Sequence, residues 1–207
     1  MSLSPPRKIN LGSGKDFRAD YLNIDIDDYW QPDVLADVSG DFPPGGRATY
    51  TTSRFGEIEI AHQAFDEIIC RDVLEHVPDL VRTMTNCLNL LKVGGRFNIL
   101  VPYDLSYGAW QDPTHIRAFN ERSWLYYTDW FWYLNWTSHR FVVRQLTYAP
   151  SPLGQELAAS GTRQDVVLRT PRAIDSMSVS LEKIALSETD KDTLYRFRPN
   201  RSPQAPS

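Results

Sequence analysis

The sequence predicts an α/β fold with a mostly parallel seven-stranded sheet, helices on both faces and a closing antiparallel hairpin. Two observations support this prediction. In the first hundred residues, short apolar runs alternate with turn signals and with a helical pattern, as in a parallel sheet. After residue 139, two further apolar runs are separated by a stretch rich in Pro, Gly and Ser, as in a hairpin that closes a sheet.

The expected elements follow from hydrophobic periodicity and turn residues. Strands are expected at residues 7–11, 22–26, 33–37, 66–70, 96–101, 140–148 and 165–169. Residues 78–91 carry the apolar stripe of a helix, whereas residues 53–64 fit either a short strand or a helix. Asn120 is expected to cap a second helix, residues 121–134, and residues 181–195 are expected to form a terminal helix.

The length of 207 residues suits one domain, which we assign to residues 7–197. Residues 1–6 are expected to be disordered or left over from cloning, and residues 198–207 to be a disordered tail. The net charge of -4 argues against a nucleic-acid partner, and no apolar run reaches membrane-spanning length. The start of the chain lacks the pattern of a secretion signal, so a cytoplasmic location is expected. Cys70 and Cys87 are expected to be buried free thiols.

The first strand ends in Gly12-Ser13-Gly14, where the absence of a side chain allows the backbone to pass close to a ligand. In open α/β sheets, ligands bind at the carboxyl ends of the strands. Asp25 ends the second strand, and its carboxylate is suited to accept hydrogen bonds from the two hydroxyls of a ribose, with Asp27 as an alternative. Each feature by itself also fits a plain turn or a solvated acid.

Two cofactor classes use glycines and an acid in this way. A dinucleotide enzyme requires a third glycine in Gly-x-Gly-x-x-Gly and an acid about 20 residues further on. Here Phe17 occupies the third glycine position, and Asp25 follows Gly14 by only eleven residues. The spacing therefore argues against a nicotinamide dinucleotide.

Two further sequence motifs follow the glycine turn and Asp25 along the chain. Asp72-Val73-Leu74-Glu75-His76 follows the fourth strand, and Leu91-Lys92-Val93-Gly94-Gly95 precedes the fifth. Over roughly residues 7–120, the chain thereby resembles class I S-adenosylmethionine (SAM) dependent methyltransferases, in particular the bacterial "type 11" group. The resemblance implies a Rossmann-like fold, SAM as the cofactor, a cofactor half at residues 7–101 and a substrate-side segment at residues 102–136.

The resemblance also implies which residues bind SAM. Asp25 would hold the ribose, Asp37 the adenine amino group and the Val38 backbone N–H a ring nitrogen, while Arg71 and Asp72 would line the methionine end. The full expected set is Asn10, Gly12, Ser13, Gly14, Asp25, Ile26, Asp37, Val38, Arg71 and Asp72. The chain departs from the family at Asn10, where an acid is usual, and at Asp16, where a third glycine is usual.

Four polar residues of the substrate-side segment are candidates for catalysis: Tyr103, Asp104, Asp112 and His115. His115 is expected to act as a general base, because imidazole titrates near neutral pH. It lies in a string, residues 112–119, that resembles one in type 11 relatives associated with bacterial surface sugars. Alternatively, Asp112, His115 and Arg117 form an internal network that holds a long loop. No metal is expected, because these ligands are few and scattered.

Five of the six tryptophans lie between residues 110 and 136. About half of the aromatic residues of the segment 124–136 are expected in the core, and the rest at a substrate pocket or a homodimer surface. The expected function is methyl transfer from SAM to an oxygen or nitrogen of a small-molecule or sugar-like acceptor. A methyltransferase-like binding module without catalysis and an NAD-dependent sugar-modifying enzyme are the alternatives.

Overall fold

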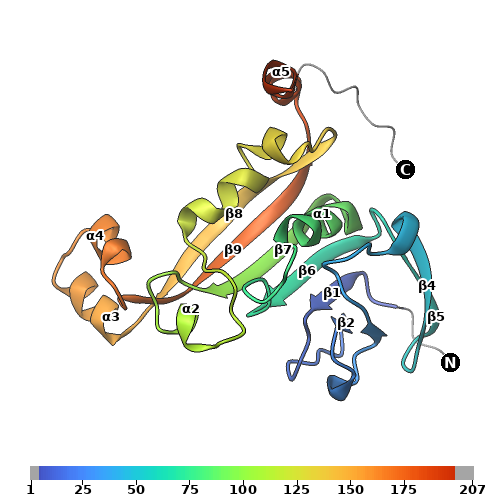
Figure 1. Cartoon of the computed structure of the whole chain (residues 1–207), viewed down its shortest axis with the longest axis horizontal. Helices are drawn as coiled ribbons and strands as arrows, with labels where there is room; N and C mark the ends of the chain where they lie inside the picture. The colour runs from blue at the N-terminus through green and yellow to red at the C-terminus, as the bar shows by residue number, and fades with distance from the viewer. Residues whose placement is uncertain (1–4, 199–207) are drawn as a thin grey trace.

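The computed structural model describes residues 5–198, so the expectations for residues 1–4 and 199–207 lie outside the described residues (Figure 1). Seven strands form one sheet in the order β3-β2-β1-β6-β7-β9-β8. The parallel strands are β1 (Lys8–Leu11), β2 (Leu22–Asp25), β3 (Val34–Leu35), β6 (Phe65–Arg71) and β7 (Leu91–Pro102). The antiparallel strands are β8 (His139–Pro150) and β9 (Ile174–Ala185). The predicted fold class is confirmed.

The strand order reverses at β1, which has β2 on one side and β6 on the other. The chain runs outward from β1 through β2 to β3, and then returns to the opposite side of β1 at β6. The loops that leave β1 and β6 diverge at this point, so a crevice opens at the carboxyl ends of these strands.

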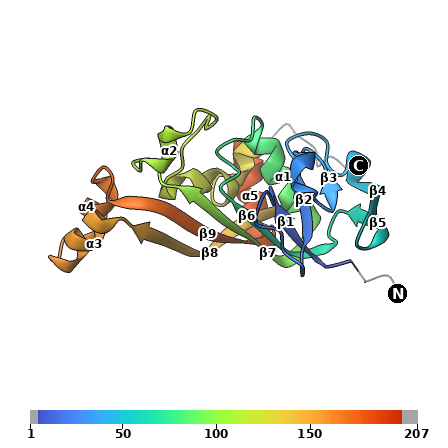
Figure 2. The same cartoon turned by 90° about the horizontal axis from the view of Figure 1, so that it is seen from below.

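One face of the sheet carries the main core. Helix α1 (Leu80–Leu90) packs there through Met84, Cys87 and Leu88, and the short helix α2 (Gly108–Gln111) lies on the same side (Figure 2). Both cysteines are buried free thiols, as predicted. In the described part of the chain, the connection from β1 to β2 contains no helix. The face with Asn98 and Ser178 instead borders an open groove of about 220 Å³, which departs from the expectation of helices on both faces.

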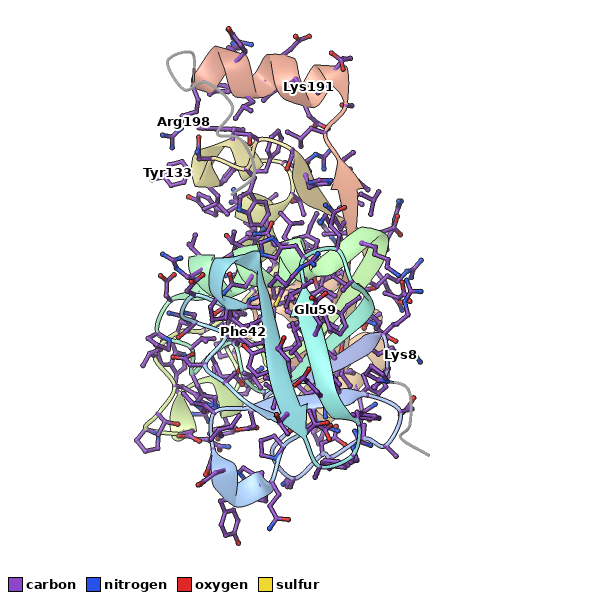
Figure 3. The ribbon with its side chains drawn as sticks, turned by 90° about the vertical axis from the view of Figure 1, so that its right-hand side faces the viewer. Lys8, Phe42, Glu59, Tyr133, Lys191 and Arg198 are labelled. Carbon is purple, nitrogen blue, oxygen red and sulfur yellow. The ribbon has the colours of Figure 1, made fainter. Side chains whose placement is uncertain are left out.

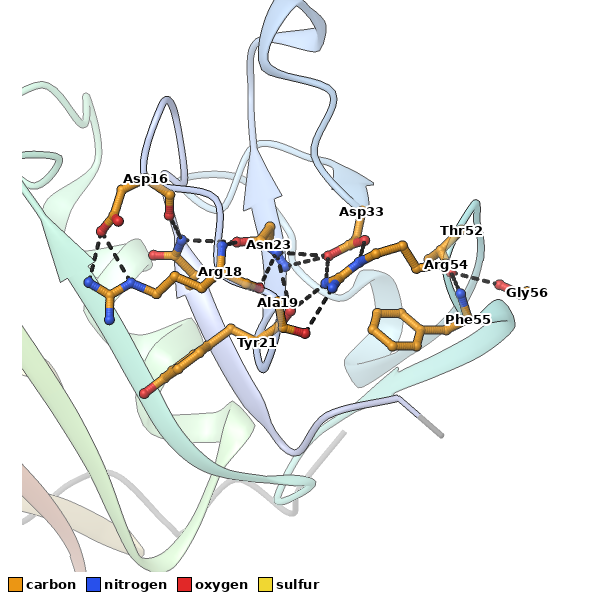
Figure 4. Close-up of polar contacts among 11 residues, drawn as sticks. Asp16, Arg18, Ala19, Tyr21, Asn23, Asp33, Thr52, Arg54, Phe55 and Gly56 are labelled. Carbon is orange, nitrogen blue, oxygen red and sulfur yellow. Dashed lines mark hydrogen bonds and ion pairs between the residues drawn. The ribbon is translucent and has the colours of Figure 1, made fainter. Parts of the chain in front are cut away.

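A buried polar network replaces the missing helix (Figure 4). Asn23 in β2 accepts hydrogen bonds from the Asn10 amide at 3.0 Å and from the Arg18 backbone N–H at 2.9 Å. Its own amide donates to Asp33 at 3.0 Å, and Arg54 reaches the same carboxylate at 2.6 Å. The loop between β1 and β2 is therefore fixed by side chains and not by the backbone hydrogen bonds of a helix.

The ambiguous residues 53–64 contain a strand. Strands β4 (Arg47–Thr52) and β5 (Gly56–Ala61) form a separate hairpin, in which Ile58 and Ile60 are buried and Glu59 is exposed (Figure 3). Short 3-10 turns η1 (Asp28–Trp30) and η2 (Pro44–Gly46) precede it. The period-2 alternation of the sequence thus reflects one buried face.

The expected C-terminal elements are partly wrong. Residues 165–169 belong to helix α4 (Gln164–Arg169), which follows helix α3 (Pro152–Ala159), and the strand that pairs with β8 is β9. In β9, the apolar residues Met177, Val179 and Leu181 alternate with serines and an acid, which is the period of a strand. The prediction of a helix from residue 181 was therefore wrong at its start. The terminal helix α5 (Glu188–Phe197) begins after this strand.

The aromatic segment forms two 3-10 turns, η3 (Glu121–Tyr127) and η4 (Phe131–Leu134), instead of one α-helix. Asn120 caps the first of them, as predicted. Trp124 is buried and stacks on Phe119 with ring centroids 5.6 Å apart, whereas several neighbouring aromatic rings remain exposed. Helix α5 lies against η4 (Figure 3). None of the helices that the structure describes is long and apolar enough to cross a bilayer.

Candidate functional site

A cavity of about 840 Å³ lies at the carboxyl ends of β1, β2 and β3. This is the crevice at which the strand order reverses. Its lining includes Gly12, Asp25, Ile26, Asp27, Trp30, Asp37, Val38, Asp72, Val73, His76, Asp112 and Thr114. The three strand ends that the sequence identified as a cofactor site therefore lie around one cavity.

Gly12 shapes the floor of this cavity. Its φ of +63° lies in the left-handed region, and a Cβ atom there would approach Cγ2 of Val73 to 2.3 Å. The Gly12 backbone N–H donates to the Ile24 carbonyl at 2.8 Å, which fixes the turn against β2. Only glycine meets both the conformational and the steric requirement at this position.

Asp25 is 8% exposed and ties the turn to the second strand. Its Oδ2 accepts a hydrogen bond from the Gly14 backbone N–H at 2.7 Å, and its Oδ1 accepts one from the Asp27 backbone N–H at 3.0 Å. Each carboxylate oxygen has capacity for a second hydrogen bond, so Asp25 is suited to bind ribose hydroxyls from the cavity. Asp27, the alternative acid, lies beside it on the same wall.

Asp37 and Val38 close the far end of the cavity. Asp37 Oδ1 accepts hydrogen bonds from the Ser39 backbone N–H at 2.8 Å and the Ser39 hydroxyl at 2.7 Å. The Val38 carbonyl accepts one from the Asn86 amide at 2.9 Å, which anchors this turn to α1. The glycine turn and the two acids at neighbouring strand ends thus fit the close approach, the diol and the amino group of an adenosyl cofactor.

Trp30 is a cavity residue that the sequence analysis missed. Its side chain is 40% exposed and lies on the cavity wall beyond β2. A partly exposed indole at a cofactor cavity offers a flat apolar face for a purine or a ribose. In the sequence, Trp30 lies far from the other five tryptophans, and this isolation could have marked it as a site residue.

Some expected site residues do not line the cavity. Asn10 is buried in the β1–β2 loop network, where its amide donates to the Asp16 carbonyl at 2.7 Å, and Arg71 borders the groove on the open sheet face. Both lie elsewhere because successive strand residues point to opposite faces. Ser13 is buried behind the turn, and Gly14 takes part only through its backbone bond to Asp25.

Tyr103 and Asp104 line neither this cavity nor a second cavity that adjoins it. The Tyr103 hydroxyl donates to Glu121 Oε2 at 2.8 Å, and burial raises the pKa of Tyr103 far above its usual value. Asp104 accepts a hydrogen bond from the Asn120 amide at 2.9 Å. Both side chains are held by the segment that begins η3, so neither is placed to act on a substrate in the cavities.

A second cavity of about 440 Å³ adjoins the first. Asp72, His76 and Asp112 border both cavities, and Glu75 and His115 line the second. The His76 and His115 rings lie 4.5 Å apart, nearly perpendicular to each other. The loop after β6 and the substrate-side segment therefore meet at the wall between the two cavities.

Glu75 is unusual among these residues. It is 1% exposed, and neither of its carboxyl oxygens has a hydrogen-bond partner among the described residues. Burial raises the pKa of Glu75 to about 7. A buried carboxyl group without partners is costly, so its position at a cavity wall requires a reason.

A chain of hydrogen bonds orients the surrounding groups. Asp112 Oδ1 accepts from the Thr114 hydroxyl at 2.7 Å and from its backbone N–H at 2.8 Å, and these bonds lower the pKa of Asp112. The same hydroxyl lies 2.9 Å from Nδ1 of His76. His115 Nδ1 lies 3.1 Å from the Ala109 carbonyl, and its Nε2 lies 4.0 Å from Asp112 Oδ2.

Arg117 holds this arrangement together. Its guanidinium donates to the carbonyls of Leu74 and Pro78, each at 3.1 Å, and to that of Val77. All its described hydrogen bonds are internal, as in the loop-holding alternative. Arg117 therefore fixes the substrate-side segment to the loop after β6.

Comparison with known proteins agrees with this geometry. A family model described as a methyltransferase domain matches residues 10–99. A SAM dependent methyltransferase from Archaeoglobus fulgidus superposes with a TM-score of 0.53 at 14% identity, over 86% of each chain. A putative methyltransferase in complex with the Haloferax volcanii Trm112 activator gives 0.52 at 12% identity, over 87% of this chain and 84% of that one.

The [4+2]-cyclase SpnF also has this fold, with a TM-score of 0.52 at 14% identity, over 87% of this chain and 76% of that chain. At such identities, structural similarity is informative about the fold alone. No match was found among curated proteins.

Proposed function

We propose that this chain, a SAM-dependent methyltransferase whose matched domain spans residues 10–99, transfers the methyl group to an oxygen or nitrogen of a small-molecule or sugar-like acceptor. One observation carries the proposal: the cavity with Gly12, Asp25 and Asp37 shares a wall with a second cavity. SAM in the first cavity would present its methyl group to an acceptor in the second.

The cofactor contacts follow from the strand ends. Asp25 would accept hydrogen bonds from the ribose hydroxyls, and Asp37 would accept one from the adenine amino group. The Val38 backbone N–H would donate to a ring nitrogen, while Trp30 covers the adenosine. Asp72 lies at the end that the methionine would occupy, where a carboxylate favours its ammonium group.

The reaction is an in-line displacement. A lone pair of the acceptor attacks the methyl carbon, the carbon–sulfur bond breaks, and the sulfonium leaves as the neutral thioether S-adenosylhomocysteine. A hydroxyl acceptor also releases its proton, so the products are the methyl ether, the thioether and one proton. Positioning would supply much of the rate, and Asp112 or His115, which both line the second cavity, would accept that proton.

Calorimetric titration of the protein with SAM, S-adenosylhomocysteine and NAD tests the cofactor site. We expect the first two to bind and Asp37→Ala and Asp25→Ala to weaken that binding about 5- to 150-fold, since each leaves polar cofactor groups unpaired. Asp20→Ala is the control, because Asp20 is an exposed acid outside the cavity. Binding of NAD without SAM would overturn the assignment.

A second measurement separates catalysis from mere binding. Release of S-adenosylhomocysteine is followed by mass spectrometry during incubation with SAM and with pools of hydroxyl- and amine-bearing sugars and small molecules. Acceptor-dependent release supports methyl transfer. Tight SAM binding without release for any acceptor pool would favour a non-catalytic binding module.

A further inference from the structure

We propose that Glu75, His76 and His115 bind one divalent transition-metal ion, of the zinc or ferrous class, at the wall shared by the two cavities. One potential ligand atom from each residue lies within 4.8 Å of the others. Ligands around one ion at about 2.0–2.2 Å lie about 3–4 Å from one another, so small side-chain rotations complete the site. No metal was expected from the sequence, because the candidate ligands of the substrate-side segment are few and scattered.

The Glu75 carboxyl group is the first observation that points to a cation. Its side chain is buried, lines the second cavity and has no hydrogen-bond partner among the described residues. An unpaired carboxylate in such a place is destabilising unless a positive charge compensates it. A bound metal ion supplies this compensation and accounts for an acid that the fold otherwise leaves unpaired.

The two histidines are oriented as metal ligands. His115 Nδ1 faces the Ala109 carbonyl, which can only accept a hydrogen bond, so Nδ1 carries the proton. The Thr114 hydroxyl donates to the Asp112 carboxylate, so His76 Nδ1 must in turn donate to Thr114. Each ring therefore has its lone pair on Nε2, as in histidines that bind metals while a carbonyl or carboxylate holds the other nitrogen.

The ligand set selects the class of ion. Two imidazoles and one carboxylate suit zinc and ferrous iron, whereas magnesium and calcium prefer oxygen ligands. Three protein ligands leave coordination positions open, which is typical of catalytic sites. The open side faces the cavities, because all three ligands line the second cavity and His76 also lines the first.

The location assigns the ion a role that rests on the proposed function. A hydroxyl oxygen of the acceptor would bind the open position, which lowers its pKa and directs its lone pair to the methyl carbon of SAM. His115 would then act as a ligand, not as the base. Asp112, with Oδ2 4.0 Å from His115 Nε2, would accept the hydroxyl proton and pass it to solvent. The preferred acceptor is therefore an alcohol or a sugar hydroxyl.

The test uses the full chain after treatment with a chelator. Zn²⁺ is titrated calorimetrically, and Co²⁺ is followed by its visible absorption, which reports its coordination geometry. We expect one equivalent in the wild type and at least a 100-fold loss of affinity in Glu75→Gln and His115→Gln. His139→Gln is the matched control and should bind as the wild type does, because His139 lies in β8 outside the cluster.

Glu75→Gln also addresses folding. The amide has the shape of the carboxyl group without its charge, so the variant should melt no lower than the wild type without metal. Zn²⁺ should raise the melting temperature of the wild type and leave that of Glu75→Gln unchanged. Wild-type protein that binds no ion, or variants that bind it equally well, would overturn the site.

SAM titration of the same samples separates the two proposals. Normal SAM binding in Glu75→Gln, with lost metal binding and lost transfer to hydroxyl acceptors, supports both. Metal binding without SAM binding in the wild type leaves the metal site in place and refutes the proposed function. Full transfer by metal-free protein refutes the role of the ion in the reaction.

Discussion

Replacing Gly12 by alanine tests the geometry on which the cofactor cavity depends. At φ +63° an alanine costs about 1–2 kcal/mol relative to glycine. The added Cβ would also lie 2.3 Å from Cγ2 and 2.9 Å from Cγ1 of Val73, and such overpacking costs about 1–3 kcal/mol. We therefore expect Gly12→Ala to lower the free energy of unfolding by about 2–5 kcal/mol.

Gly14→Ala is the matched control. Its φ is +43°, yet no atom lies within 4 Å of the Cβ position, so only the backbone cost of about 1–2 kcal/mol applies. Urea denaturation gives the free energy of unfolding of each variant by linear extrapolation. SAM titration should show weaker binding for Gly12→Ala, because the turn must move away from Val73 and with it the cavity floor.

Val73→Ala should rescue Gly12→Ala. Removing both γ carbons leaves only the β carbon, 3.2 Å from the new methyl group, so most of the overlap disappears. The double variant should recover at least about 1 kcal/mol relative to the sum of the single variants. Equal costs for Gly12→Ala and Gly14→Ala, or no rescue, would refute this account of the turn.

Two further predictions concern buried charges. Burial lowers the pKa of Lys183 to about 8, although its ammonium group donates to the Leu91 carbonyl at 2.7 Å. The pKa of Lys183 is lower in the folded protein than in the unfolded one, so burial of its charged form destabilises the fold fully below about pH 8 and less as the pH rises toward 10.5. The free energy of unfolding should therefore rise by about 2 kcal/mol from pH 8 to 10. Lys183→Met should abolish that rise. Arg54→Leu should cost about 3–5 kcal/mol, since Asp33 stays buried without its cation, whereas Arg7→Leu at an exposed pair should cost under about 1 kcal/mol. Equal losses in urea denaturation would contradict this difference.

The sequence by itself determined the parallel part of the sheet and the turn at its centre. Gly12 was recognisable because Gly-x-Gly directly follows an apolar strand, and Asp25 because it ends the next one. Both signals are local, since turn residues and period-2 alternation act within a few positions. Strand β9 carries the same period-2 alternation, so the helix predicted at residues 181–195 was wrong where it overlaps this strand.

The tertiary structure alone decided which polar residues of the substrate-side segment reach the site. Tyr103 and His115 were both candidates from the sequence, yet the first bonds to Glu121 and the second meets Glu75 and His76. The path of this segment depends on Arg117, which binds carbonyls about 40 positions earlier in the chain. Such contacts leave no periodic pattern in the sequence, because a guanidinium can bind the backbone carbonyl of a residue whatever the side chain of that residue.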